Sequence, residues 1–152
     1  MGLDMYLTGK RYLWSYPEDN PDSLVAKSIA EIFPNIDGKI KEVQAEFAYW
    51  RKANAIHKWF VDNVQDGKDE CQETYLEKSH LESLLSVVNE VLQDTSKAPE
   101  LLPTTSGFFF GSTEYSEWYF RDLEYTKEVI GKLLDKWDTD YKGWSFYYQA
   151  SW

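Results

Sequence analysis

The apolar residues of this 152-residue chain alternate with a period of two near both ends and follow a helical period between them. Alternation over residues 3–7 and again over 12–16 predicts a hairpin that turns at Gly9-Lys10. The aromatic run at 144–152 predicts a final strand. Strands that lie far apart in sequence and are separated by helices are typical of an α+β fold. We therefore expect one domain over residues 1–152, with a small, mostly antiparallel sheet packed against about four helices.

The middle of the chain carries the helical signals. Asn20-Pro21 opens a helix that ends at Pro34, because a capping residue is followed by proline at the first helical position. A capping box at Ser79-His80-Leu81-Glu82 introduces the clearest amphipathic helix. The apolar stripes predicted for these two helices are Leu24, Val25, Ser28, Ile29 and Ile32 for the first, and Leu81, Leu84, Leu85, Val88, Val91 and Leu92 for the second.

Three further segments complete the predicted order. Residues 39–48 alternate like a strand, but no breaker separates them from a helix expected over 49–64, so a helical alternative stays open. Residues 70–77 predict a short strand. A long helix is expected from about 114 to 137.

Charge and cysteine content limit the classes of partner. The net charge is −10, which repels nucleic-acid backbones and anionic membranes, so we expect neither general nucleic-acid binding nor membrane binding. Mimicry of DNA is disfavoured because the acidic residues are dispersed. Cys71 is the single cysteine, which suits a reducing compartment, and we expect a cytoplasmic protein. Nothing in the sequence predicts a cofactor.

The segment 49–60 carries the first candidate site residues. On the expected helix, Trp50 lies on the apolar arc, His57 falls inside that arc, Asn54 sits on its margin and Arg51 points away. A histidine in such a place is either a packed residue with satisfied hydrogen bonds or a ligand contact or general base. No second ligand stands three or four residues away, so no metal site is expected.

The loop at 104–112 carries the second group. Three consecutive phenylalanines stand between Gly107 and Gly111, and we expect them to fold inward because they are apolar. Ser112 and Glu114 are expected at a helix N-terminus, as a structural cap or as part of an anion site. Ser106 and Gly107 belong to the same candidate loop. The spacing matches neither a P-loop nor a dinucleotide fingerprint.

Asp122 and a group of aromatic residues complete the candidate site. Asp122 projects into the apolar arc of the last helix, as either an exposed edge residue or a buried carboxylate that shapes a pocket. The partners we expect for a buried carboxylate are Arg51, Asn54, His57 or a tyrosine hydroxyl. Some aromatic residues are in excess of one core and suit stacking on a planar ring or binding a cation. They include Trp50, Tyr115, Trp118 and Tyr119, near Arg51 and Lys52.

Several blocks of the chain resemble a family of small uncharacterised proteins of tailed bacteriophages and prophages. They are the start Met-Gly-Leu-Asp-Met-Tyr-Leu, residues 49–60, residues 102–115, Glu117-Trp118-Tyr119-Phe120 and Phe146-Tyr147-Tyr148-Gln149. The resemblance spans most of the chain and brings no assigned activity. It implies a phage accessory protein that acts in the cytoplasm of the bacterial host cell, and such proteins often counter host defences.

Three functions are left open, in this order. The first is a binding module that sequesters a small nucleotide-type ligand between the 49–64 helix and the 104–115 loop. The second is an acidic inhibitor that binds a host defence protein or nuclease. The third is a hydrolase with His57 as base and Asp122 or Glu114 as its orienting group; no nucleophile motif supports it, so catalysis ranks below binding. A homo-oligomer is also possible, through the hairpin or the final strand as a sheet edge.

Overall fold

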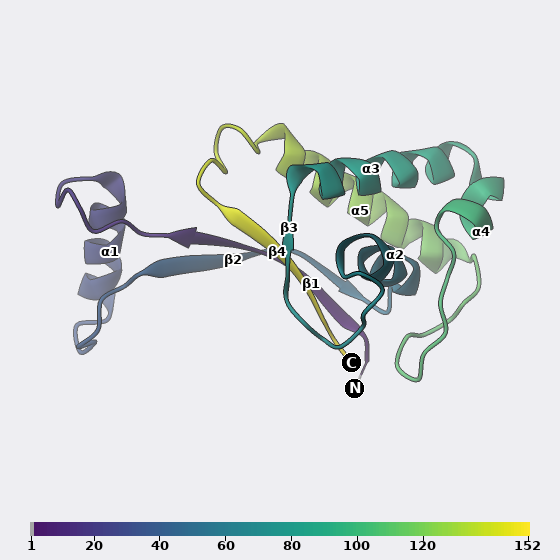
Figure 1. Cartoon of the computed structure of the whole chain (residues 1–152), viewed down its shortest axis with the longest axis horizontal. Coiled ribbons are helices and arrows are strands. Elements are labelled where there is room, and N and C mark those ends of the chain that lie inside the picture. Colours follow the sequence, from purple (N-terminus) through teal and green to yellow (C-terminus); the bar gives the residue numbers. More distant parts are fainter. Residues whose placement is uncertain (1) are drawn as a thin grey trace.

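The computed structural model describes residues 2–152 and is built on a four-stranded sheet in the order β2-β1-β4-β3, with every neighbouring pair antiparallel. The elements are β1 (Asp4–Tyr12), α1 (Pro21–Ile32), β2 (Glu42–Arg51), α2 (Asn54–Val64), β3 (Thr74–Leu76), α3 (Lys78–Gln93), η1 (Thr95–Lys97), α4 (Ala98–Leu101), α5 (Glu117–Asp135) and β4 (Ser145–Ser151). The prediction of one small α+β domain is confirmed. β1 and β4 are paired neighbours, so both ends of the chain lie close together (Figure 1).

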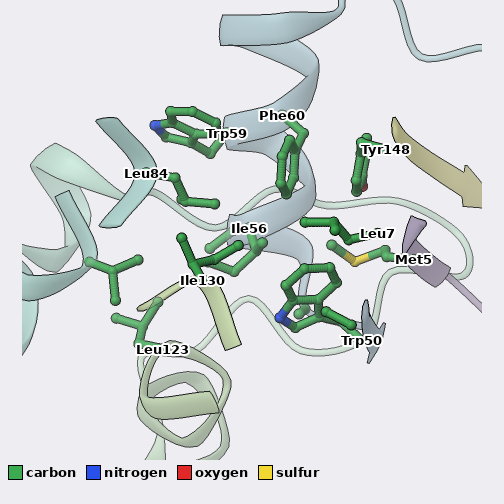
Figure 2. Close-up of a cluster of buried hydrophobic side chains, with 14 of the residues drawn as sticks. Met5, Leu7, Trp50, Ile56, Trp59, Phe60, Leu84, Leu123, Ile130 and Tyr148 are labelled. Carbon is green, nitrogen blue, oxygen red and sulfur yellow. The ribbon is translucent and has the colours of Figure 1, made fainter. Parts of the chain in front are cut away.

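The sheet has one covered face and one open face. On β1, Met5 and Leu7 are buried, while the alternating residues Tyr6 and Thr8 are only partly covered. Helices α2, α3 and α5 lie on the covered face (Figure 1). Figure 2 shows the side chains of strands and helices meeting there, among them Phe60 and Tyr148, whose rings stack with centroids 3.9 Å apart. Each large apolar side chain buried in this way contributes roughly 1.5–3 kcal/mol.

The predicted hairpin turn at Gly9-Lys10 is wrong, because β1 runs straight through it. The partner of β1 is β2, which joins it through the distant segment 13–41. Gly9 is required by packing rather than by a turn. A Cβ at this position would stand 2.4 Å from Cε2 of Phe47, so the ring occupies the space that any side chain would need.

Three predicted helix starts are displaced. β2 continues to Arg51, so the helix expected from 49 begins only at Asn54, after Lys52 turns the chain with φ of 59°. α5 begins at Glu117 rather than 114. α3 begins at Lys78, and Glu77 rather than Ser79 is its cap. The backbone N–H of Glu77 donates to Nδ1 of His80 over 3.1 Å. The predicted apolar stripe of α3 is buried or partly buried.

The segment 12–41, called the arm below, projects beyond the rest of the domain, called the body (Figure 1). It carries α1, whose cap Asn20 accepts a bond from Ser23 N over 2.8 Å, as the sequence predicted. Arg11 at the end of β1 holds α1 through an ion pair of 2.7 Å with Asp22. The predicted apolar stripe of α1 is largely exposed.

The sheet edges are β2 and β3. β4 lies between β1 and β3, so the expectation that the final strand offers a free edge is wrong. The same holds for β1, which is paired on both sides.

Candidate functional site

A cavity of about 310 Å³ lies where β2 turns into α2, facing the loop before α5 and the first turns of that helix. Its lining residues are Arg51, Lys52, Ala53, Asn54, Ala55, Ile56, Thr104, Gly111, Ser112, Glu114, Ser116, Trp118, Tyr119, Asp122 and Leu123. Six of the predicted site residues are among them, namely Arg51, Asn54, Ser112, Glu114, Trp118 and Asp122. The structure thus brings together three segments that are far apart in sequence.

Two helix N-termini line this cavity. α2 begins after Ala53 and α5 after Ser116, and neither helix has a side-chain hydrogen bond that caps it. The N–H of Asn54 donates to Lys52 O over 2.9 Å. The other N–H groups of an uncapped first turn have no partner within the helix, and the turn carries the positive end of the helix dipole. Anions bind at such helix starts. For the anion site the sequence predicted one helix start, at Ser112-Glu114. The observed starts are at Glu117, a few residues further on, and at Asn54.

Charged side chains of both signs surround the cavity. The Arg51 side chain is 60% exposed and lies 3.9 Å from Asp4, a distance too long for a tight pair. Lys52 and Glu114 are exposed and form no ion pair among residues 2–152. The cavity therefore offers cationic groups and two carboxylates, Glu114 and Asp122, to a ligand, rather than charge of one sign.

Asp122 is the carboxylate inside the cavity. Its side chain forms no hydrogen bond or ion pair with residues 2–152; only its backbone carbonyl is used, by Thr126 over 2.6 Å. The partners expected from the sequence therefore do not contact it. Burial raises the pKa of Asp122 to about 6, because the charged form is poorly solvated there. A half-buried, unpaired carboxylate in a cavity suits a ligand that brings N–H donors.

Asn54 fixes the shape of the cavity. Its side-chain amide donates to the carbonyl oxygens of Phe110 at 3.0 Å and Ser112 at 2.8 Å, and its oxygen accepts from Thr105 N at 3.1 Å. Its hydrogen-bonding groups are thus engaged with the loop. Asn54 is a positioning residue that holds the 104–112 loop against α2.

Trp118 and Tyr119 supply the aromatic surface of the cavity. Trp118 is 71% exposed, with Arg121 stacked over its ring at 5.0 Å. The Tyr119 hydroxyl donates to Leu102 O over 2.8 Å, so only its ring is left for a ligand. Burial raises the pKa of Tyr119, which keeps that hydroxyl a donor.

His57 lies outside the cavity, in the core. Its Nδ1 is 2.6 Å from the Tyr148 hydroxyl and its Nε2 is 2.9 Å from Asp69 Oδ2. Burial, with a smaller contribution from Asp69, raises the pKa of Tyr148, so this hydroxyl stays protonated and donates. His57 accepts at Nδ1 and donates from Nε2 to Asp69. The prediction of a packed histidine with satisfied bonds is confirmed, and its partner is neither Asp122 nor Glu114.

The other predicted site residues also lie away from the cavity lining. Trp50 is buried and its indole N–H donates to Thr126 Oγ1 over 2.9 Å. The Tyr115 hydroxyl accepts from Thr104 N over 3.3 Å. Ser106 and Gly107 are exposed at the loop tip.

The three phenylalanines of the loop do not share one environment. Phe110 is buried and packs edge-on against His57, and Phe109 is partly buried. Phe108 is 95% exposed, so the prediction that all three fold inward is wrong for this residue. The turn that contains Phe108 begins at Gly107 and closes with a bond from Phe110 N to Gly107 O over 3.1 Å; a Cβ at Gly107 would stand 2.6 Å from the Phe110 ring.

Sequence reasoning missed several lining residues. Ser116 lines the cavity but was not predicted, and Lys52 and Tyr119 were named only with the aromatic group and not as site residues. Sequence motifs did not indicate the backbone N–H groups at the starts of α2 and α5, because these starts have no capping side chain. Placing the starts of α2 and α5 correctly would have found them.

No family model, no curated protein and no solved structure matches the chain. Across residues 2–152, no helix is long and apolar enough to cross a membrane. The same residues contain no cluster of three or more histidine, cysteine or acidic side chains that would hold a metal ion.

Proposed function

We propose that this chain is a binding module that sequesters a small nucleotide-type ligand in the cavity between α2, the 104–116 loop and α5. The observation that carries the proposal is the meeting of two uncapped helix N-termini with Arg51 and Lys52 in one cavity. Such a meeting favours a phosphate or another anion.

Two other lining residues favour a nitrogen-rich ring. Asp122 accepts N–H donors when ionised, and nucleobases carry such donors on their edges. The exposed face of Trp118 suits stacking. The volume of about 310 Å³ lies at the lower end of small-molecule sites, roughly 300–1,000 Å³, which favours a mononucleotide or one end of a longer nucleotide.

Thermal unfolding in the presence of a nucleotide panel tests the proposal. The panel holds mononucleotides, cyclic dinucleotides and trinucleotides, and ADP-ribose derivatives. A ligand at about 100 times its dissociation constant adds roughly 2.7 kcal/mol, which for a domain of this size raises the melting temperature by about 5–10 °C. Mass spectrometry of the released molecule separates binding, which returns it intact, from turnover.

Variants locate the site. Arg51→Ala and Lys52→Ala are expected to weaken binding about tenfold each, as loss of charged hydrogen bonds to an anion does. Lys132→Ala, the same change on α5 outside the cavity lining, is the control. A ligand that binds equally well to all of these variants would place the site elsewhere, and a panel without any shift would count against the proposal.

The resemblance to phage proteins supplies a role for such binding. Retention of a nucleotide signal would withhold it from a host defence that the nucleotide activates, and we include this counter-defence role in the proposal. Measured defence signalling in host cells should fall with the wild-type chain and recover with Arg51→Ala.

The second candidate function is an inhibitor that binds a host defence protein or nuclease. It is favoured by one observation: eight of the fifteen exposed large apolar or aromatic side chains among residues 2–152 lie within residues 12–36. Exposed patches of this kind mark interaction surfaces. Co-purification of a host protein that Ile32→Asp abolishes would support it. A hydrolase based on His57 gains no support, because both ring nitrogens are engaged inside the core.

A further inference from the structure

α1 faces the segments 13–15 and 38–41 of the arm with the side opposite to the one that its sequence pattern suggests. Asp22 and Ser23 are buried, and the small Ala26 is partly buried. Leu24 and Ile32 are 56% and 70% exposed. The apolar stripe of this helix therefore faces solvent, and its small and polar side faces the chain.

This orientation is fixed by specific bonds. Asp22 accepts from Arg11 at 2.7 Å and from the backbone N–H of Trp14 at 3.3 Å. The Ser23 hydroxyl bonds to the carbonyl of Trp14 at 3.3 Å. Rolling the helix to bury Leu24 would leave the Asp22 carboxylate and its partners unpaired, which costs more than the exposed leucine. The stripe is thus left open to another surface.

We propose that the stripe is covered by a second copy of this chain, in a two-fold dimer with the two α1 helices antiparallel and crossing near Ser28. At that crossing Leu24 meets Ile32 of the second copy, and the reverse contact repeats it. Ser28 is small enough for close approach. Its hydroxyl is already bonded to Leu24 O over 2.9 Å, so it can be buried without losing a partner.

The charged residues beside the stripe can pair with the same residues of a second copy. Lys27 and Glu31 lie one turn apart on the same side of it, and Glu31 has no ion-pair partner among residues 2–152. Two-fold antiparallel pairing brings Lys27 of each copy within one turn of Glu31 of the other. α1 stands at the end of the arm (Figure 1), so the bodies of two chains with net charge −10 are held apart.

Analytical ultracentrifugation over a concentration series tests the dimer. The wild-type chain is expected to sediment with twice the monomer mass. Ile32→Asp should raise the dissociation constant at least about a hundredfold, because it places a charge in the apolar contact. Its melting temperature at low concentration should be unchanged, which shows that the variant still folds. A wild-type chain that stays monomeric at every concentration would overturn the proposal, and would leave the arm to a partner of another kind.

A charge exchange tests the antiparallel geometry. Lys27→Glu and Glu31→Lys should each weaken the dimer about tenfold, since each converts two attractive contacts into repulsive ones. An equimolar mixture of the two variants should recover wild-type affinity, because the mixed dimer pairs opposite charges at both contacts. Lys132→Glu, the same charge change on α5, should leave the dimer unchanged. A mixture that stays as weak as its components would refute this pairing.

Discussion

The body and the arm bury opposite kinds of side chain. In the body, α3 places Leu84 and Val88 in the core and turns its charged residues outward. In the arm, α1 buries Asp22 and leaves Leu24 exposed. Both helices have apolar residues at helical spacing, so the spacing alone does not distinguish them.

The difference teaches what an apolar stripe does and does not specify. A stripe predicts that a helix has an apolar side, but the elements next to it decide whether that side is covered. α3 packs against α5 and α2, which contribute apolar side chains to the same core. α1 is held by the ion pair of Asp22 with Arg11 and by bonds of Asp22 and Ser23 to the backbone of Trp14. The core organises the body, whereas the arm is incomplete without another surface.

The largest expected effect comes from the same substitution made in both regions. Leu84→Ala should lower the free energy of unfolding by about 3–5 kcal/mol, because Leu84 is fully buried and its loss leaves a cavity. Leu24→Ala should change it by less than about 0.5 kcal/mol in dilute protein, where the chain is monomeric. Urea unfolding of both variants measures the contrast. Equal losses would show that α1 buries its stripe within its own chain.

His57→Ala tests whether the polar groups of the body are structural. It should cost about 2–4 kcal/mol, because the Tyr148 hydroxyl and the Asp69 carboxylate lose their partner. Tyr148→Phe, a milder change, should cost about 1–2 kcal/mol. Neither variant should alter ligand affinity per folded molecule, measured by calorimetry below the melting temperature. If a folded His57→Ala variant lost ligand binding, His57 would have to be assigned to the binding site.

The sequence predicted elements in both regions: the capped helix of the arm, and the final strand and the stripe of α3 in the body. The strand at 144–152 and the stripe of α3 follow from local spacing and were found. The predicted hairpin failed because Gly9 suits a turn and a crowded strand equally well, and only the distant Phe47 decides between them. The start of α2 failed because Trp50 fits both a helical arc and the strand alternation, and the pairing of β2 with β1 decided for the strand.

The candidate site was predicted in part for a related reason. Arg51, Asn54 and Asp122 drew attention as polar residues among apolar ones, and the cavity contains all three. His57 shares that signal, but its partners Asp69 and Tyr148 could not be identified from spacing. The uncapped starts of α2 and α5 could not be predicted as part of the site, because no capping side chain marks them in the sequence.

Asp122→Asn tests the carboxylate in the cavity. The pKa of Asp122 is raised to about 6, so the folded state holds a proton that the unfolded state releases near pH 4. The contribution of this group to stability is therefore present below pH 4 and lost as pH rises to 6. Asp122→Asn should raise the free energy of unfolding by about 1–3 kcal/mol at pH 7 and make little difference at pH 4.

Unfolding of the wild type and this variant from pH 4 to 7 measures the effect. Glu124→Gln, which removes a charge from an exposed position on the same helix, is the control. If the free energy of unfolding depends on pH equally in the wild type and in Asp122→Asn, burial does not destabilise the ionised carboxylate. Ligand affinity in the wild type should rise above pH 6 if the ionised carboxylate accepts the ring donors.

The smallest expected effect concerns Phe108, the exposed aromatic residue at the loop tip of the body. It is 95% exposed, more than any large apolar side chain of the arm. Exposure alone would therefore make it the better interface residue. It stands on a loop, where its ring meets that of Phe109 edge to face, rather than on a continuous stripe. Phe108→Ser should therefore change the free energy of unfolding by less than about 0.5 kcal/mol and leave the sedimentation of the dimer unchanged. If this variant dissociates the dimer while Leu24→Ala does not, the interface lies on the body, and the stripe of α1 is not what the second copy binds.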